Sequence, residues 1–194
     1  MKSRDTEFLY EIGTLRFIDR TWRQFLNKDF ANLAEHMLRM TWIAMIIAKN
    51  EGADMEKVIK MALVHDIAES RTGDVHYLSN KYVDRHEDRA LRDMLKDTSL
   101  EEEFLELMDE YEKRDSLESH VVKDADNIDV DFELMEQKTR GYGGAGFWKE
   151  DRSERIGKNL FTETGKKLWK ELHDTNPHSW HKNGPHIFKE NTEE

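Results

Sequence analysis

The sequence contains no cysteine, which excludes disulfides, thiolate metal ligands and cysteine nucleophiles. It has only two prolines, Pro177 and Pro185, and both stand near its end. Long apolar runs are also lacking, because the most apolar stretch, 40–48, is far too short to cross a bilayer. The first ten residues include Asp5 and Glu7, which is unlike a secretory signal. We therefore expect a cytoplasmic protein that does not span a membrane.

Basic residues are in the minority, since 30 Lys and Arg stand against 41 Asp and Glu, a formal net charge of −11. A nucleic-acid-binding protein would show a basic stripe, whereas the charge clusters here are acidic, at 101–103, or mixed, at 84–92. We therefore expect no nucleic-acid partner. A small phosphorylated substrate is compatible with this charge, and a negative field raises the local concentration of divalent cations.

The long proline-free and charge-rich body favours helices, and no segment shows sustained strand alternation. We predict an all-α bundle, with one domain over 1–175 (core about 20–139) and a polar tail over 176–194. Four of the ten glycines fall in 141–146, which we expect to be a loop. This loop lacks the Gly-Lys-Ser/Thr of a P-loop. The expected helices cover about 7–19, 33–50, 55–69, 82–97, 100–113, 117–139 and 153–173.

The strongest local signal is His65-Asp66, where an apolar helix suddenly presents two types of metal ligand side by side. Adjacent helical residues point about 100° apart, so both reach one ion only near a helix end. The turn at Gly73 agrees with such an end. The pair alone is equally compatible with a histidine placed against the negative end of the helix dipole.

Two further signals lie on other expected helices. His36 precedes an apolar stretch that must be core, where a lone histidine is more often structural than a ligand. Asp126 follows Val121 and Val122, and a carboxylate buried beside them requires a metal or another cation nearby. The ordinary alternative is a salt bridge with Lys123. Two other acids compete with Asp126 for the same role, Asp124 and Asp129.

In chain order these residues read His36, His65-Asp66 and Asp126, which resembles the H…HD…D pattern of the HD-domain metal-dependent phosphohydrolases. The string His65-Asp-Ile-Ala-Glu-Ser-Arg-Thr-Gly-Asp74 resembles the extended motif HDxxExxxGD of the 5′-deoxynucleotidase branch. Upstream, Arg20-Thr-Trp22 and Ala34-Glu-His36 resemble the Arg-Trp and Glu-His segments of the family. The resemblance covers roughly residues 8–139.

The resemblance implies an HD-domain helical bundle in which one divalent ion is held by His36, His65, Asp66 and Asp126. Two imidazoles and two carboxylates without thiolates suit Co²⁺, Mn²⁺, Ni²⁺, Fe²⁺ or Mg²⁺ better than structural Zn²⁺. The resemblance also implies that Glu69 acts in proton transfer. The role implied for Asp74 is to orient the water or the sugar. Taken alone, each of these two acids is also explained as an ordinary helix-end or turn residue.

A phosphate substrate also needs cations and a surface for its nucleoside. Arg20 is the expected clamp, because a guanidinium binds phosphate bidentately. Trp22 is expected to pack against the sugar or base, with core filling as an equal alternative. Lys81 extends the anion site in this hypothesis. Other basic residues available around the loops are Arg71, Arg140 and Lys149.

The sequence thus predicts a phosphohydrolase acting on a nucleotide, with a deoxynucleoside 5′-monophosphate as the first substrate. One alternative is a phosphohydrolase for nucleoside di- or triphosphates, and another is a non-catalytic nucleotide-sensing module. The resemblance also implies a homodimer, for which the apolar helix 33–48 is one candidate surface. We expect the C-terminal histidines to form part of a polar surface and not a second metal site. We also expect that the central histidines do not bind a second ion. The C-terminal ones are His173, His178, His181 and His186, and the central ones are His76, His86 and His120.

Overall fold

The computed structural model describes residues 2–182 of the chain. Within this part the regular elements are all helices, which confirms the predicted all-α fold, and Asp19 and Asn32 form an isolated antiparallel bridge. None of the helices described is long and apolar enough to cross a membrane. With η marking 3₁₀ helices, the elements are α1 (Asp5–Ile12), η1 (Gly13–Phe17), η2 (Thr21–Gln24), α2 (Leu33–Glu51), α3 (Met55–Val64), α4 (Glu69–Thr72), η3 (Ser79–Lys81), α5 (Glu87–Leu95), α6 (Glu101–Lys113), α7 (Leu117–Thr139), α8 (Ala145–Arg155), η4 (Gly157–Asn159), α9 (Glu163–Asp174) and α10 (Ser179–Lys182).

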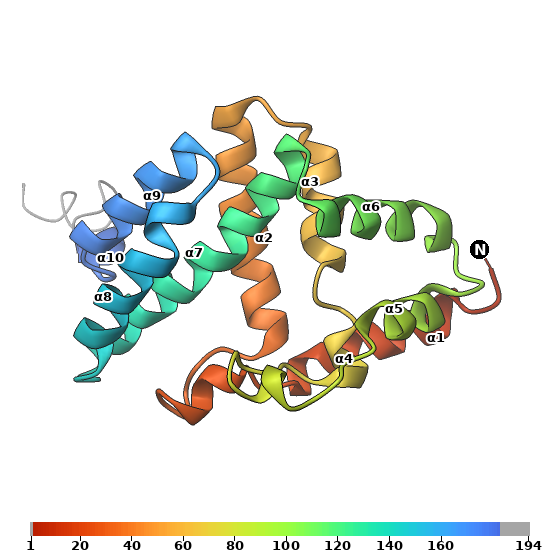
Figure 1. Ribbon diagram of the computed structural model, residues 1–194, viewed down its shortest axis with the longest axis horizontal. Coiled ribbons are helices and arrows are strands. Elements are labelled where there is room, and N and C mark those ends of the chain that lie inside the picture. Colours follow the sequence, from red (N-terminus) through yellow and green to blue (C-terminus); the bar gives the residue numbers. More distant parts are fainter. Residues whose placement is uncertain (1, 183–194) are drawn as a thin grey trace, which may run out of the picture.

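Helices α2 and α7 pack against each other at the centre of the bundle, and α3 packs on both. Helices α8 and α9 lie on one side of α7, while α6 lies on the other side and also packs on α3 and α5 (Figure 1). The core is made where the central helices meet, and it includes the fully buried side chains of Met40, Met61 and Ile128. Burial of each such side chain contributes about 1.5–3 kcal/mol.

Helix α2 begins and ends where the sequence predicts it. Asn32 accepts a hydrogen bond from the backbone N–H of Glu35, whose side chain accepts one from the backbone N–H of Asn32. Such a capping box satisfies two donors that a helix start leaves unpaired. The helix ends at Gly52, which has a φ of 75°, a conformation that glycine adopts without strain. This firm start fixes the position of His36, one turn into the helix.

The predicted helix 55–69 is wrong, because the regular α-helix ends at Val64. After it the backbone forms bonds between residues three apart, such as Glu69 N–H to Asp66 O at 3.0 Å and Ser70 N–H to Ile67 O at 3.1 Å. These bonds tighten the chain into a narrower turn before the short α4. The tightened turn allows His65 and Asp66 to face the same point.

The predicted single helix 153–173 is also wrong, because α8 and α9 are separate elements that flank η4. The break is fixed by Asp124, whose carboxylate accepts hydrogen bonds from the backbone N–H groups of Phe161 and Thr162. Thr162 in turn caps α9 through Gly165 N–H at 2.9 Å. The expected loop 141–146 is shorter than predicted, since α8 begins at Ala145.

Three other predicted boundaries differ from the structure. The expected helix 7–19 ends as α-helix at Ile12 and continues as η1, after which Ile18 is extended and accepts from Leu33 N–H at 2.9 Å. The expected helix 82–97 begins only at Glu87, since the chain before it turns inward at Arg85. In the expected tail, α10 is helical, while His186 lies outside the described residues. The division into 1–175 and 176–194 stays a prediction.

Candidate metal centre and active site

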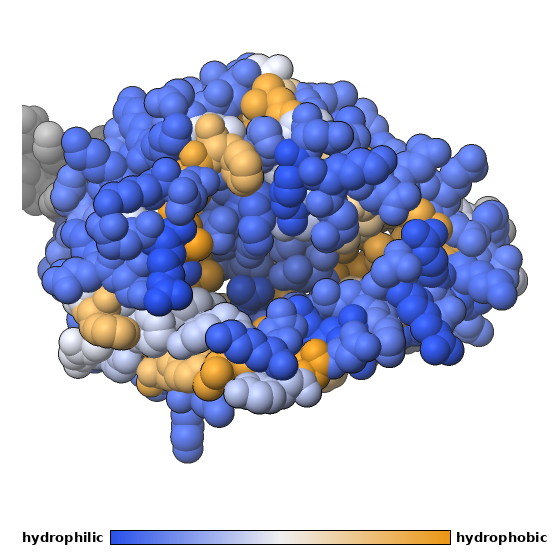
Figure 2. All heavy atoms as spheres, viewed as in Figure 1, coloured by the Kyte–Doolittle hydropathy of each residue, from blue (hydrophilic) through white to orange (hydrophobic). Residues whose placement is uncertain are grey.

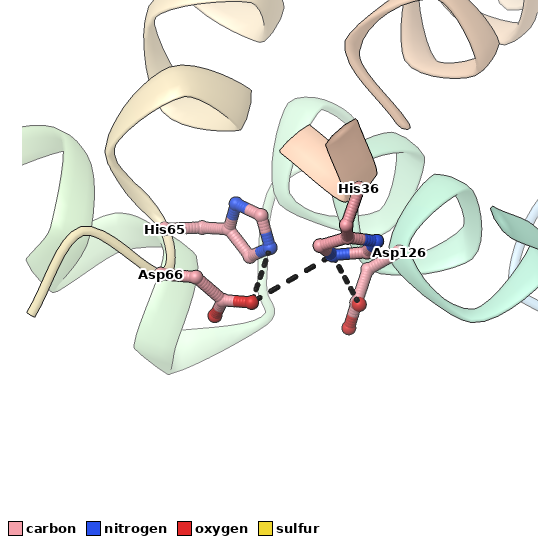
Figure 3. Close-up of side chains that lie close together, drawn as sticks. All are labelled: His36, His65, Asp66 and Asp126. Atoms are coloured by element: carbon pink, nitrogen blue, oxygen red, sulfur yellow. Dashed lines mark ion pairs between the residues drawn. The ribbon is translucent and has the colours of Figure 1, made fainter. Parts of the chain in front are cut away.

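Four side chains from three elements converge at one point beside the centre of the bundle. They are His36 from α2, His65 and Asp66 from the turn after α3, and Asp126 from α7, and Figure 3 shows them pointing toward one another. Each offers a ligand atom, and these atoms all lie within 4.8 Å of one another. Two histidines and two aspartates in this arrangement could hold one metal ion.

The two imidazoles are oriented by hydrogen bonds at their far nitrogens. His36 Nδ1 lies 2.7 Å from Asp129 Oδ2, and His65 Nδ1 lies 2.8 Å from the backbone oxygen of Ala62. Because both partners are acceptors, each Nδ1 carries a proton, so in the neutral imidazole each Nε2 presents its lone pair to the centre. Both Nε2 atoms are buried and lack a hydrogen-bond partner. An ion at the centre would satisfy both, so the residues present fit a metal.

The carboxylates at the centre complete the donor set. Asp66 Oδ2 lies 3.1 Å from His65 Nε2 and 3.7 Å from His36 Nε2. Asp126 Oδ1 lies 3.5 Å from His36 Nε2, and its Oδ2 accepts from Lys123 Nζ at 2.8 Å. The salt bridge with Lys123, which the sequence left as an alternative, is therefore present together with the convergence.

The three competing aspartates of α7 have separate roles. Asp126 faces the central group, and Asp129 stands behind His36 as its hydrogen-bond partner. Asp124 is turned away and accepts from the 161–162 backbone and from the Thr162 hydroxyl. Of the three alternatives left open by the sequence, Asp126 is the one in the central group.

The protonation of the central acids suits metal binding. Burial by itself would raise the pKa of Asp66, but the adjacent His65 lowers that pKa to about 2. The pKa of Asp126 is also held well below its usual range, by Lys123 and His36 acting against burial. Burial and Arg20 would lower the pKa of His36, but the neighbouring carboxylates of Asp126 and Asp129 raise it to about 9. A metal must therefore displace a proton from this histidine at neutral pH.

Glu69 and Asp74 lie beside the central group. The Oε2 atom of Glu69 is buried and lacks a hydrogen-bond partner. Burial raises the pKa of Glu69 to about 10, and the nearby charges of Asp66 and Asp74 add to this effect. Asp74 Oδ2 accepts from the backbone N–H of Thr21 at 2.8 Å and lies 3.5 Å from Arg20 Nε. One acid is thus available for exchange of a proton, and the other is held in place.

Comparison with known proteins places the chain in a family. A model described as HD domain matches residues 12–169, most of the chain. The chain belongs to the HD-domain family. The resemblance that the motif indicated is therefore confirmed over a longer stretch than the sequence suggested.

Curated relatives of this HD-domain protein include 5′-deoxynucleotidase HDDC2 from Danio rerio, 32% identical over 136 residues, which span 67% of this chain and 68% of the relative. The Homo sapiens protein of the same name is 31% identical over 67% of this chain and 66% of its own. The match therefore spans about two thirds of these relatives. Among solved structures, a conserved hypothetical protein from Pyrococcus furiosus has a TM-score of 0.72 and 25% identity, and the match covers 88% of this chain and all of that one.

Arg20 and Trp22 frame the HD-domain site from η2 and the residue before it. The buried guanidinium of Arg20 lies 3.4 Å from Asp66 Oδ2, besides its contact with Asp74, so it braces two acids of the site. Trp22 packs on Phe30 and, edge to face, on Trp148. It also lines a cavity of about 330 Å³ beside α8. Trp22 thus contributes to packing, as one of the two alternatives expected, and its contact with a sugar or base stays a prediction.

A larger cavity, of about 410 Å³, opens over the metal ligands between α3, α5, α6 and α7. Figure 2 shows a hydrophilic hollow in the middle of this face of the molecule. The lining of the 410 Å³ cavity includes His65, Asp66, Glu69 and Asp126. It also includes three basic residues that the sequence did not single out as substrate ligands. These are Arg85, Arg114 and Lys123.

The other basic residues named from the sequence lie elsewhere. Lys81 is exposed at the end of η3 and is not part of the lining of the 410 Å³ cavity, so its role in substrate binding stays a prediction. Arg71 contacts Glu11, with Nε to Oε1 at 2.5 Å. Arg140 and Lys149 are exposed and lie outside this lining as well.

The remaining histidines within residues 2–182 have other surroundings. His173 Nδ1 contacts the backbone oxygen of Trp169 at 2.7 Å, and His178 and His181 contact each other. His120 stacks on Phe161, and His76 contacts Ser79. His86 stands immediately before α5. In the described part of the chain, none of them belongs to the four-residue group.

Proposed function

We propose that this HD-domain protein is a metal-dependent phosphohydrolase that releases phosphate from a nucleoside 5′-monophosphate, with deoxynucleotides as the preferred class. The observation that carries the proposal is the pair of buried, unpartnered imidazole nitrogens beside two ionised carboxylates. Buried polar atoms in purely structural clusters are as a rule hydrogen-bonded. The relatives named 5′-deoxynucleotidase support the substrate class.

The reaction breaks the bond between phosphorus and the 5′ oxygen while the oxygen of a water molecule bonds to phosphorus. One divalent ion, held by His36, His65, Asp66 and Asp126, would neutralise charge on the phosphate and lower the pKa of water. The protein must then carry a proton from the attacking water and supply one to the departing oxygen. Glu69 is the group for this transfer, because its side chain lines the cavity, its Oε2 has no hydrogen-bond partner, and its raised pKa keeps a proton available for the departing oxygen. The products are a nucleoside and inorganic phosphate.

Asp74 and Arg20 hold parts of this arrangement in place. Asp74 is anchored by Thr21 N–H, and we assign it the role of orienting the water or the sugar. Arg20 lies between Asp66 and Asp74 and opposes the mutual repulsion of these acids. The phosphate clamp and the nucleoside contact remain the proposed roles of Arg20 and Trp22.

The lining of the 410 Å³ cavity favours a single phosphate group over a polyphosphate. Seven of its residues are Asp or Glu and three are Lys or Arg. A triphosphate tail would add negative charge to a wall that is already acidic. Nucleoside di- and triphosphates therefore stand as the second candidate substrate class.

The decisive experiment is phosphate release from deoxynucleoside mono-, di- and triphosphates in the presence of Mn²⁺, Co²⁺, Ni²⁺, Fe²⁺ or Mg²⁺. We expect metal-dependent release from monophosphates, with ribonucleotides cleaved more slowly. Release only from triphosphates would replace the substrate assignment. Metal binding without turnover of any nucleotide would indicate the sensing module, and activity that survives Asp66→Ala would contradict the proposed centre.

We also propose a homodimer that pairs through α2. Leu38, Trp42 and Ile46 lie at successive turns of this helix and are 64%, 60% and 52% exposed. A contiguous apolar stripe on a surface helix is typical of an interface. Light scattering should give a dimer mass for the wild-type protein and a monomer mass for Trp42→Glu. The cytoplasmic location and the stoichiometry of one ion are likewise proposals.

A further inference from the structure

Two buried atoms without hydrogen-bond partners belong to two side chains that line the 410 Å³ cavity, and neither belongs to the metal group. One is Oε2 of Glu69, an acceptor when ionised, and the other is Nε of Arg85, a donor. Their side chains are in contact, with Arg85 Nη1 3.5 Å from Glu69 Oε1. A buried polar atom without a partner calls for an explanation, and here a donor and an acceptor face the same space.

Arg85 is held in this position by contacts at one end of its guanidinium. Nη1 lies 2.7 Å from Glu87 Oε1 and 3.5 Å from the backbone oxygen of Gly73, besides its contact with Glu69. The side chain is 18% exposed. The Nε–H is thus fixed in direction by the anchoring of Nη1 and has no acceptor of its own. A preorganised donor of this kind loses little entropy when it binds an anion.

The other cations around the centre are already engaged. Arg20 contacts Asp66 and Asp74, and Lys123 Nζ donates to Asp126 at 2.8 Å. Arg114 donates to the backbone oxygen of Tyr111 and lies over its ring. Arg85 also lines the cavity, but it differs from these residues because its buried Nε–H has no acceptor.

We propose that Arg85 binds the phosphate of the substrate through Nε–H and holds it next to Glu69. This inference rests on the proposed function and deepens it, since it adds to the clamp proposed for Arg20 a second phosphate contact, from a residue that the sequence did not indicate. A phosphate monoester supplies the acceptor that Nε lacks, and its attacking water supplies a hydrogen for Glu69 Oε2. The binding site would thereby pair both orphan atoms at once.

The test compares the wild-type protein with Arg85→Gln, Arg85→Lys and the control Arg89→Gln. Arg89 is a matched control because it lies four residues away, is 81% exposed and is not part of this lining. The probe is inorganic phosphate, measured by calorimetry on the Mn²⁺-loaded protein and as a product inhibitor of hydrolysis. We expect Arg85→Gln to weaken phosphate binding roughly tenfold to a hundredfold, as for the loss of a hydrogen bond to a charged group. Arg89→Gln should leave it unchanged.

Arg85→Lys keeps the charge but loses the planar donor, so we expect partial recovery of phosphate affinity. Its thermal unfolding, measured beside that of Arg85→Gln, separates lost binding from lost folding. Unchanged phosphate affinity in a folded Arg85→Gln protein, with only kcat reduced, would overturn the inference and leave Arg85 as a positioning residue for Glu69. Arg85-dependent phosphate binding by a wild-type protein that hydrolyses no nucleotide would support the inference and refute the proposed function.

Discussion

Helix α7 buries acidic residues on two faces, and the two faces differ in whether the buried polar groups have hydrogen-bond partners. On one face Asp131, with no exposed surface, accepts from Arg152 Nε at 3.0 Å, from Arg152 Nη2 at 2.9 Å and from Trp169 Nε1 at 3.1 Å. On the other face Asp126 lies among two histidines whose Nε2 atoms have no hydrogen-bond partner. The same residue type on one helix is thus fully satisfied in one place and left among unsatisfied groups in the other.

This difference separates a structural ion pair from a site. The ion pair of Asp131 and Arg152 joins α7 to α8, and the hydrogen bond from the indole of Trp169 adds α9. Both charged groups are therefore paired within the protein, and they hold three helices together. Around Asp126, by contrast, buried polar atoms lack hydrogen-bond partners, which lowers the stability of the fold unless a ligand binds there. Residues 126 and 131 are five apart, about 140° around the helix, so one element serves both purposes.

The largest contrast should come from Asp126→Asn compared with Asp131→Asn. We expect Asp126→Asn to reduce kcat/KM by about a thousandfold, because it removes a charged metal ligand and with it several kcal/mol of transition-state stabilisation. Phosphate release at saturating Mn²⁺ measures the loss. Activity within tenfold of wild type would remove Asp126 from the centre.

The second variant of this pair, Asp131→Asn, should act on stability instead. Removing one partner of a buried ion pair leaves the Arg152 charge uncompensated, a cost of about 3–5 kcal/mol. Urea unfolding of both variants measures it, and we expect the smaller change in Asp126→Asn. A combined replacement of both partners by apolar residues should recover part of the stability, and failure to destabilise would show that this face is not structural.

The sequence could indicate the central group because its members carry a motif with a fixed order. The residue types alone left open the choice among Asp124, Asp126 and Asp129, since it depends on which face of α7 meets α2, and only the family resemblance pointed to Asp126. Arg85 was missed for a related reason. It lies in a non-helical stretch that the charge pattern made look like a helix, and no local signal marks where such a side chain points.

The helix boundaries that were wrong also have tertiary causes. The end of α3 depends on the tight turn at residues 65–68, and the break before α9 depends on hydrogen bonds to Asp124, 37 and 38 residues away in the chain. Propensity cannot register either effect. Helix α2, by contrast, has its cap and its terminating glycine in the local sequence, and its bounds were predicted to within one residue.

A smaller effect is expected behind His36. Asp129 Oδ2 orients the imidazole, and Oδ1 lies 2.5 Å from Arg39 Nε, so Asp129 links the centre to a half-buried cation. We expect Asp129→Asn to weaken metal binding roughly 10–100-fold, the usual range for partners of ligating histidines. Calorimetric titration with Mn²⁺ measures it. Glu136→Gln changes another partner of Arg39, remote from the imidazole, and should leave the affinity near the wild-type value.

The most graded effect should appear with pH in the metal-free protein, at Glu69 beside the group that contains Asp126. The pKa of Glu69 is about 10 in the folded chain against an ordinary value of 4.5, so above pH 4.5 folding requires uptake of a proton. Stability linked to Glu69 is therefore complete below pH 4.5 and is lost as pH rises toward 10, by at most about 1.4 kcal/mol per pH unit. The side chain introduced by Glu69→Gln cannot ionise. The free energy of unfolding of this variant, minus that of the wild type, should therefore increase between pH 5.5 and 8.5. Urea unfolding in EDTA measures this difference; a pH-independent difference would mean that Glu69 is not a buried, protonated acid. Because His36 is present in both proteins, its own titration cancels from the comparison.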